Sequence, residues 1–249
     1  YVDKTDMICE LASVPGKFFF ARPRRFGKSL LLSTFESLFR DGLKNFQGLK
    51  IEQLWTDKST YKVIKLDFSR VKPEGTFEDF CQYFDNYLEA QFSLIGFKKE
   101  DNGLFLSNQI EIFLAGLSSS SLVLLIDEYD APLTACLDNK EFFERVRNYL
   151  SRFYGILKAN DRVLRFLFIT GITKFNKTSI FSELNNLSDV SLSPRFGTLL
   201  GYTHEEVETY FDGYLTQSAS VLSVSRDELL RSLTKQYDGF CFERTTTKK

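Results

Sequence analysis

The feature that most constrains the fold is the unbroken apolar run Leu122–Ile126, which Asp127 and Glu128 follow directly. A strand of apolar residues only is typical of the interior of a parallel sheet, because helices cover both of its faces there. Carboxylates directly after such a strand are costly unless they leave the core at a site or bind a cation. We therefore expect a parallel sheet with an acidic pair at the carboxyl end of one strand.

The rest of the chain alternates between strand and helix patterns, which predicts an α/β fold with a parallel sheet flanked by helices. The expected strands are residues 18–21, 61–68, 122–126, 164–169 and a short last strand at 198–200. The expected helices are residues 28–40, with Gly42 as the C-cap, and 76–92, 108–117, 142–157, 203–214 and 226–237.

A boundary near Tyr202 divides this prediction into two parts. Residues 1–202 form the expected core. Residues 203–249 open with the capping-box pattern of Thr203 and Glu206. We expect them to begin a helical lid or linker that is cut short in this chain.

Gly27, Lys28 and Ser29 lie where the first strand has ended and a helix begins. The free amides and the dipole of a helix N-terminus both favour a phosphate there. Gly27 lets the backbone approach, Lys28 can reach the β and γ phosphates, and the Ser29 hydroxyl can ligate magnesium. The alternative from these residues alone is a basic turn that caps a helix.

The full G-x4-G-K-[ST] pattern is broken, because Arg22 occupies the position of the first glycine. Pro23 pushes Arg22 toward an extended backbone, so the loop is expected to be wider than usual. The arginines of the loop add positive charge. The expected nucleotide-binding residues are Arg22, Pro23, Arg24, Arg25, Phe26, Gly27, Lys28, Ser29 and Leu30.

The acidic pair supplies the second half of a nucleotide site. In a P-loop enzyme the first acid, here Asp127, holds the magnesium shell, and the second, Glu128, polarises the attacking water. Thr170 follows the neighbouring strand, where its hydroxyl could sense the γ phosphate; Arg195 is a candidate for stabilising charge. The alternatives are that the two acids are simply solvated, that the strand before Thr170 simply ends at a turn, and that Arg195 is a solvated or structural arginine.

Composition excludes several other functions. The net charge of −1 gives no global attraction to nucleic acid, although the arginines near Lys28 leave a nucleic-acid motor as a hypothesis. No apolar run approaches the ~18 residues of a membrane span. The four cysteines, Cys9, Cys81, Cys136 and Cys241, form no metal-binding pair and are typical of free thiols in the cytoplasm. The single histidine, in the capping box, argues against a Ser-His-Asp hydrolase. The 26 phenylalanines predict a core built on aromatic packing.

Several stretches together resemble the AAA-ATPase-like family. They are YVDKT (1–5), ARPRRFGKSLLLSTF (21–35), LLIDEYDAPL (124–133), FITGITKF (168–175), IFSELNNLSDVSL (180–192), GYTHEE (201–206) and YDGF (237–240).

The resemblance implies a P-loop NTPase fold akin to AAA and STAND ATPases, of the type with an additional strand and a catalytic glutamate beside the second-motif aspartate. It implies that Lys28, Ser29, Asp127 and Glu128 bind ATP and Mg²⁺, and that an arginine at position 22 is a family trait. Such domains often precede a PD-(D/E)xK nuclease-like domain, which this chain lacks, so DNA cleavage is not expected of it.

Besides the nucleic-acid motor, which the net charge disfavours, two functions remain open after these observations. The first is an Mg²⁺-dependent ATPase that acts as a switch for an attached or partner domain, with oligomers allowed. The second is a nucleotide-binding or protein-interaction module that does not hydrolyse ATP.

Overall fold

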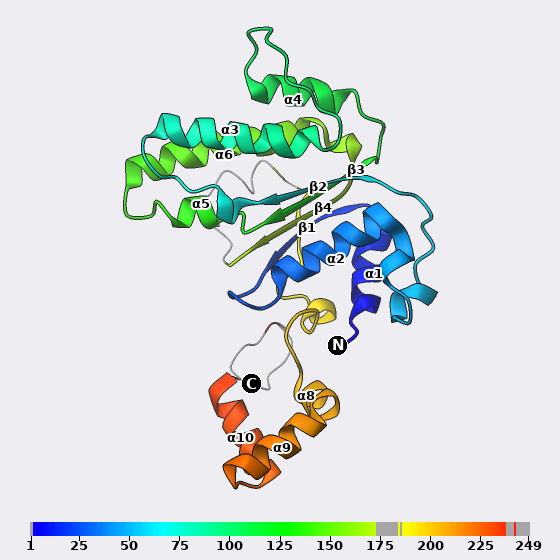
Figure 1. Cartoon of the computed structure of the whole chain (residues 1–249). Coiled ribbons are helices and arrows are strands. Elements are labelled where there is room, and N and C mark those ends of the chain that lie inside the picture. Colours follow the sequence, from blue (N-terminus) through cyan, green and yellow to red (C-terminus); the bar gives the residue numbers. More distant parts are fainter. Residues whose placement is uncertain (1, 173–183, 185, 238–241, 243–249) are drawn as a thin grey trace.

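The computed structural model describes residues 2–172, 184, 186–237 and 242. Its centre is a sheet of five parallel strands in the order β2-β3-β4-β1-β5 (Figure 1). The strands are β1 (Gly16–Ala21), β2 (Lys62–Asp67), β3 (Leu122–Asp127), β4 (Leu164–Gly171) and β5 (Ser188–Asp189). The α/β fold with a parallel sheet that the sequence predicts is therefore confirmed.

Helices cover both faces of the sheet, and three more follow it in the chain (Figure 1). The α-helices are α1 (Thr5–Ser13), α2 (Lys28–Asp41), α3 (Phe77–Ser93), α4 (Leu106–Ala115), α5 (Ala131–Thr134), α6 (Lys140–Ala159), α8 (His204–Tyr210), α9 (Asp212–Leu222) and α10 (Arg226–Tyr237). Short 3₁₀ helices are η1 (Gly42–Asn45), η2 (Lys50–Gln53), η3 (Phe68–Arg70), η4 (Asp161–Val163) and η5 (Pro194–Phe196).

The strands β3 and β4 are buried along their whole length, which explains their continuous apolar sequence. Alternate residues point to opposite faces of a strand. Val123 and Leu125 accordingly pack with α1 and α2, whereas Leu124 and Ile126 pack with α3, α4 and α6. The sheet thus separates two hydrophobic clusters, one on each face.

Phenylalanines fill much of both clusters, as their number predicts. On the α2 face, the rings of Phe166 and Phe168 stack at 5.9 Å, and Phe35 contacts them at 5.0 and 4.9 Å. On the other face, Phe84 of α3 meets Phe153 of α6 at 6.1 Å. Such ring pairs add specific geometry to the burial of apolar area.

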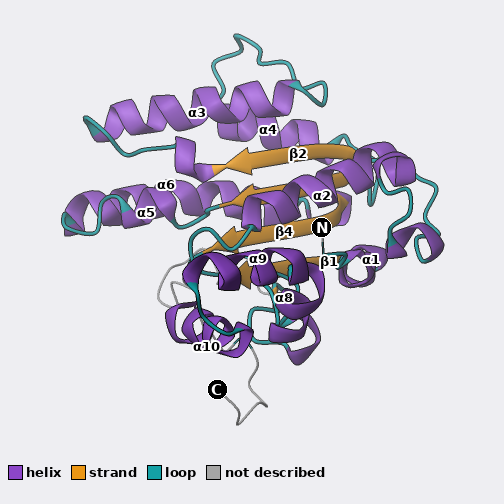
Figure 2. Ribbon diagram, turned by 60° about the horizontal axis from the view of Figure 1, so that its bottom comes forward, coloured by secondary structure: helices purple, strands orange, loops and turns teal. Residues whose placement is uncertain are grey.

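The helices α8, α9 and α10 form a smaller body below the sheet in Figure 1, which comes to the front in Figure 2. Their own cluster has three buried residues, Leu215, Ala219 and Leu229. Partly buried apolar residues complete it: Val207, Phe211, Leu230 and Leu233.

The predicted last strand at 198–200 is wrong. These residues form turns, and β5 instead pairs with β1 at Phe18↔Ser188 and Phe19↔Asp189. The Thr198 carbonyl accepts a hydrogen bond from Lys4, and Gly201 adopts a left-handed φ of 84°, so the segment cannot extend a ladder.

Two further differences concern helices. The helix that opens with the Thr203 capping box ends at Tyr210, because Phe211 leaves the helical conformation, and α9 begins after it. Helix α1 was not predicted. Its buried residues Ile8, Cys9, Leu11 and Ala12 have the spacing that could have indicated it.

Among the described residues, no helix is both long and apolar enough to cross a membrane. Cys9, Cys81 and Cys136 are free thiols, and Cys241 lies outside the described residues.

Candidate functional site

The parallel sheet brings the ends of four strands to one edge. In Figure 2 the arrowheads point the same way and mark this edge. Asp67 of β2 is in register with Asp127 of β3, and Ala21 of β1 is in register with Gly171 of β4. Because β4 lies between β1 and β3, the segments that follow β1 and β3 face each other across the end of β4.

Asp127 is the centre of the contacts at this edge. One carboxylate oxygen, Oδ2, accepts a hydrogen bond from Ser29 Oγ at 2.5 Å, and the other, Oδ1, accepts one from Thr170 Oγ1 at 2.6 Å. The side chain is almost fully buried, at 3% exposure. The start of α2 and the last residues of β3 and β4 therefore meet at one carboxylate.

Glu128 turns away from the strand immediately after Asp127. Its φ of 48° is left-handed, which costs a non-glycine residue about 1–3 kcal/mol and marks a constrained position. Its amide donates to Thr170 Oγ1 at 3.4 Å. Burial, and then the charge of Asp127, raise the pKa of the Glu128 carboxyl, and the charge of Lys28 opposes this shift. The half-buried carboxyl is thus held beside Asp127 with an increased proton affinity.

The loop before α2 turns sharply into the helix. Arg25 and Gly27 have left-handed φ values of 66° and 89°. A Cβ at Gly27 would meet only Leu200, at 3.8 Å, so the backbone conformation and not lack of space favours glycine. The first helical hydrogen bond joins Leu31 N to Gly27 O, which leaves the earlier amides of α2 without helical partners. These amides and the helix dipole make this N-terminus a place for an anion.

Lys28 is folded back over its own loop. It is 4% exposed, and its Nζ donates to the carbonyl oxygens of Arg22 at 3.1 Å and Pro23 at 3.0 Å. Burial lowers the pKa of Lys28, while the charges of Glu128 and Asp127 act in the opposite direction. The buried ammonium group of Lys28 therefore lies among loop carbonyls, at the edge of the sheet that carries Asp127 and Glu128.

The side chain of Arg22 does not face this edge. It is 1% exposed, and its guanidinium donates to backbone carbonyls of Ala21, Ser191, Phe196 and Gly197. These carbonyls engage both Nη atoms of the guanidinium in this structure, and the expected role of Arg22 toward a nucleotide stays a prediction.

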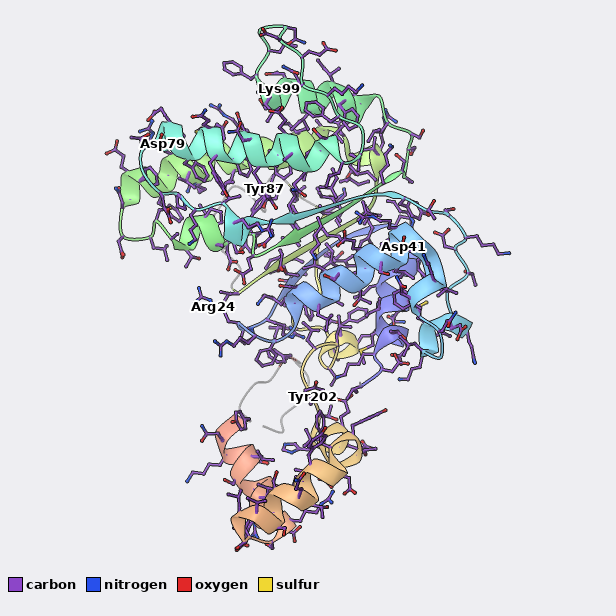
Figure 3. The ribbon with its side chains drawn as sticks, in the orientation of Figure 1. Arg24, Asp41, Asp79, Tyr87, Lys99 and Tyr202 are labelled. Atoms are coloured by element: carbon purple, nitrogen blue, oxygen red, sulfur yellow. The ribbon has the colours of Figure 1, made fainter. Side chains whose placement is uncertain are left out.

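The other loop residues differ in their surroundings. Arg24 and Arg25 are exposed, and Figure 3 shows Arg24 at the outer edge of the molecule. Pro23 is half-buried. The ring of Phe26 meets Phe242 edge-on at 5.5 Å, on the side toward α8–α10.

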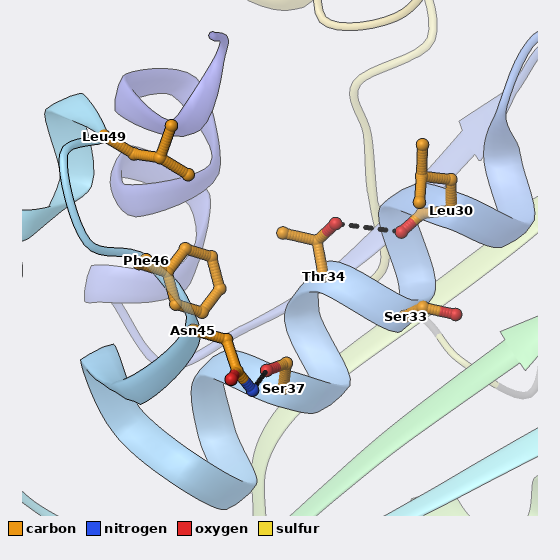
Figure 4. Close-up of a pocket in the computed structure, with 7 residues that line it drawn as sticks. All are labelled: Leu30, Ser33, Thr34, Ser37, Asn45, Phe46 and Leu49. Carbon is orange, nitrogen blue, oxygen red and sulfur yellow. Dashed lines mark hydrogen bonds between the residues drawn. The ribbon is translucent and has the colours of Figure 1, made fainter. Parts of the chain in front are cut away.

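Leu30 is 66% exposed and lines a groove of about 360 Å³ on the outward face of α2 (Figure 4). The other lining residues are Ser33, Thr34, Ser37, Asn45, Phe46 and Leu49. No lining residue is charged, so this groove offers no ionic partner for a phosphate.

Arg195 is not brought to Asp127. It lies on η5 and forms an ion pair with Glu10 of α1. In this structure its charge serves a contact between η5 and α1.

Two carboxylates near the edge were missed by sequence reasoning. Asp67 ends β2, where its Oδ1 accepts hydrogen bonds from Ser69. Asp130 is 1% exposed, and its Oδ2 accepts the amide of Ile172 at 3.0 Å. The signals were present, because Asp67 ends an alternating strand and Asp130 follows the acidic pair within one turn.

The residues at the edge fit a magnesium ion bound with a phosphate. Ser29 Oγ and Asp127 Oδ2 are both oxygen donors, which Mg²⁺ prefers, and Mg²⁺ keeps few protein ligands beside water and phosphate oxygens. No group of three or more His, Cys, Asp or Glu side chains that could hold a metal by itself occurs in the part of the chain that the structure describes.

Comparisons with known proteins show the family of the chain. The family model described as "Predicted AAA-ATPase" matches residues 1–181, which include the loop before α2, Asp127 and Thr170. The chain is 32% identical over 213 residues to a protein of Azotobacter chroococcum mcd 1 described as "Uncharacterized protein in vnfD 5'region". The alignment covers 85% of this chain and 41% of that protein, so the chain spans about two fifths of its length. No solved structure matches significantly.

Proposed function

The chain belongs to the AAA-ATPase-like family, and from this premise we propose that it binds ATP with Mg²⁺ at the carboxyl edge of the sheet and hydrolyses it. The observation that carries the proposal is the carboxylate of Asp127, which is hydrogen-bonded to both Ser29 and Thr170. These are the positions at which a P-loop enzyme holds its metal and senses its γ phosphate.

The first role of the residues is to bind. ATP with Mg²⁺ would supply the reactive γ phosphoryl group and the charge that neutralises it. Ser29 and Asp127 would hold the metal, and the amides at the start of α2 would hold the phosphates. Lys28 would exchange the carbonyls of Arg22 and Pro23 for phosphate oxygens, which are stronger acceptors for a buried ammonium.

The second role is to activate water. Glu128 is the proposed general base, because its carboxyl lies next to Asp127 and its raised pKa increases its proton affinity. Thr170 is the proposed γ-phosphate sensor. Arg24 and Arg25 are exposed beside the loop and are candidates for transition-state charge, as is Arg195 if η5 moves.

The third role is to transmit the nucleotide state. We propose residues 1–202 as the ATPase core and 203–249 as the start of a helical lid, with the whole acting as a switch for an attached or partner domain. A nuclease-like domain is the proposed partner, from the family resemblance. The free thiols favour the reducing cytoplasm as the place of action.

The test is nucleotide binding and phosphate release with and without Mg²⁺. Lys28→Ala should weaken ATP binding about tenfold or more, because a charged hydrogen-bond donor to phosphate is lost. Glu128→Gln should bind ATP but lose about a hundredfold or more in turnover. Lys65→Ala is a matched control, since Lys65 is a partly buried lysine on β2 that bonds to Ser33 outside the site.

Two results would reject the assignment. Equal turnover by Glu128→Gln and the parent would remove Glu128 as the base. Equal loss of ATP binding in Lys28→Ala and Lys65→Ala would show that stability, and not the phosphate loop, was measured.

The second candidate is a nucleotide-binding module without hydrolysis. The hydrogen bonds of Lys28 to its own loop favour it, because they must break before the lysine reaches a phosphate. ATP binding with no phosphate release in any context, including with the partner domain attached, would establish this second function.

A further inference from the structure

The residue that replaces the first glycine of the phosphate loop has an unusual set of contacts. The Nη1 of Arg22 donates to Ser191 O at 2.6 Å, and its Nη2 donates to Phe196 O at 3.2 Å and to Gly197 O at 3.4 Å. Its planar guanidinium lies between two aromatic rings, Phe20 at 4.1 Å and Phe242 at 4.0 Å. Arginine suits this place because a lysine has neither the fork of donors nor the flat surface.

The segments that Arg22 contacts lead to and from α8–α10. Residues 191–197 precede α8, and Phe242 follows α10. Phe26 of the same loop adds to this surface: its ring meets Phe242 at 5.5 Å, and a Cβ built at Gly201 would lie 3.5 Å from it, in ordinary van der Waals contact. One side of the phosphate loop is therefore packed against both ends of the helical segment.

The other side of the loop is bound to the lysine of the site. The carbonyl of Arg22 accepts a hydrogen bond from Lys28 Nζ at 3.1 Å, and the carbonyl of Pro23 accepts one at 3.0 Å. Arg22 is thus joined through its backbone to the site and through its side chain to the path into α8. Burial lowers the pKa of Arg22 to about 10, so it keeps its charge at neutral pH.

We propose that Arg22 is a positioning residue that couples occupancy of the phosphate loop to the placement of helices α8–α10. This inference rests on the proposed function. When Lys28 turns to a phosphate, the carbonyls of Arg22 and Pro23 lose their donor and the loop backbone adjusts. The guanidinium carries this adjustment to residues 191–197 and to Phe242. Lys28 has two alternative sets of partners, so the coupled element has two states.

The junction is suited to respond because the helices that it positions bury few apolar side chains. Helices α8–α10 have only three buried residues of their own. Besides Arg22, Lys4 binds the junction: its Nζ donates to Gly201 O at 3.0 Å and pairs with Glu206 Oε2 at 3.0 Å. A small change at Arg22 is therefore opposed by little packing.

The experiment is hydrogen exchange of residues 203–237 with and without a non-hydrolysable ATP analogue and Mg²⁺, together with the dissociation constant of the analogue. In the parent chain the analogue should change the opening equilibrium of these amides about fivefold or more, the lower range of allosteric coupling. Arg22→Lys keeps the charge but loses the forked set of N–H donors. It should bring the ratio of the opening equilibria with and without the analogue close to one. Phe242→Leu should reduce it while leaving the dissociation constant within about threefold.

Arg165→Lys is the matched control. Arg165 is also a buried arginine, 6% exposed, and donates to Ala12 O at 2.9 Å near the opposite edge of the sheet. The Arg165→Lys variant should lower the melting temperature without reducing the ratio of the opening equilibria with and without the analogue. Purely structural effects of Arg22→Lys would appear equally in this control.

The outcomes separate the two hypotheses. A parent chain that binds the analogue with no change in residues 203–237 overturns the coupling and leaves the proposed function intact. Full coupling in both Arg22→Lys and Phe242→Leu also overturns it. A parent chain that does not bind the analogue rejects the proposed function, and the coupling with it.

Discussion

The sheet region and the helices α8–α10 are built on different amounts of packing. In the sheet region both faces are covered by large clusters, and β3 and β4 are buried throughout. Helices α8–α10 have three buried residues and expose large side chains such as Tyr210, Tyr214 and Val221. Dense packing can hold strained positions such as Glu128, whereas a thin cluster leaves placement to a few polar contacts at the junction. The difference supports the proposed site in the first region and the proposed moving part in the second.

The largest expected contrast is between one core residue of each region. Phe35 is fully buried against Phe166 and Phe168, so Phe35→Ala should lower the global free energy of unfolding by about 3–5 kcal/mol. Leu229→Ala should cost about 2 kcal/mol and only within α8–α10. Denaturant unfolding measures the first effect and hydrogen exchange of 203–237 the second. A global loss of equal size in both variants would show that the two regions unfold as one.

Glycine substitutions should differ in sign between the regions. A Cβ at Gly171 would lie 2.6 Å from the ring of Tyr129, which is fully buried, so Gly171→Ala should cost about 2–3 kcal/mol by overpacking. Gly213 in α9 has open space around it, and Gly213→Ala should stabilise α9 by about 0.5–1 kcal/mol through helix propensity. Thermal unfolding and exchange of α9 amides test the two signs. A stabilising Gly171→Ala would contradict the tight contact at the end of β4.

The junction lysine tests how the two regions are joined. Lys4 is buried at 8% exposure and binds two carbonyls and Glu206, so Lys4→Met should weaken the placement of α8 by about 1–2 kcal/mol. Lys50 forms an exposed pair with Asp6, so Lys50→Met should change stability by about 0–1 kcal/mol. Exchange rates of the α8 amides distinguish them. Identical rates in both variants would mean that Lys4 does not hold the junction.

The smallest expected contrast is the response to acid. Burial raises the pKa of Asp85, which accepts a hydrogen bond from Tyr149 at 2.8 Å and lies near Cys81 and Lys99. A carboxyl whose pKa is higher in the folded chain than in the unfolded chain makes the free energy of unfolding fall as pH rises above about 4. Asp85→Asn should therefore stabilise the sheet region at neutral pH, and the gain should vanish near pH 4. Melting temperature against pH measures it; a gain that grows with acid would contradict the raised pKa.

In α10 the dependence of stability on pH has the opposite sign. Hydrogen bonds from Ser225 lower the pKa of Glu228, and the charge of Arg231 acts in the same direction. The stabilising cap is present above the ordinary pKa of a glutamate and is lost as pH falls through the lowered value. Acid should thus lower the protection of the α10 amides relative to their intrinsic exchange at the same pH, and Glu228→Gln should remove that dependence. An unchanged dependence in the variant would show that another group controls α10.

Local patterns were sufficient to predict much of the fold and the position of the candidate site. The apolar run of β3, the alternation of β2 and the helical spacing of α2, α3 and α6 each reflect which faces are buried, and burial dictates residue type at short range. Because all strands of a parallel sheet end at the same edge, residues 27–29 and 127–128 could be expected to meet there. Asp67 and Asp130 follow the same rule and could have been included.

Other features were decided only by the tertiary structure. The path of Arg22 to the carbonyls of 191–197, the pairing of β5 with β1 and the contact of Lys4 with Glu206 join segments about 170–200 residues apart. Such contacts depend on where the whole chain places a carbonyl or a carboxylate, and a charged residue has the same local sequence signature whether it faces solvent, a phosphate or the protein backbone. The sequence therefore could not indicate that, in the folded chain, the Arg22 side chain donates to backbone carbonyls and Arg195 pairs with Glu10.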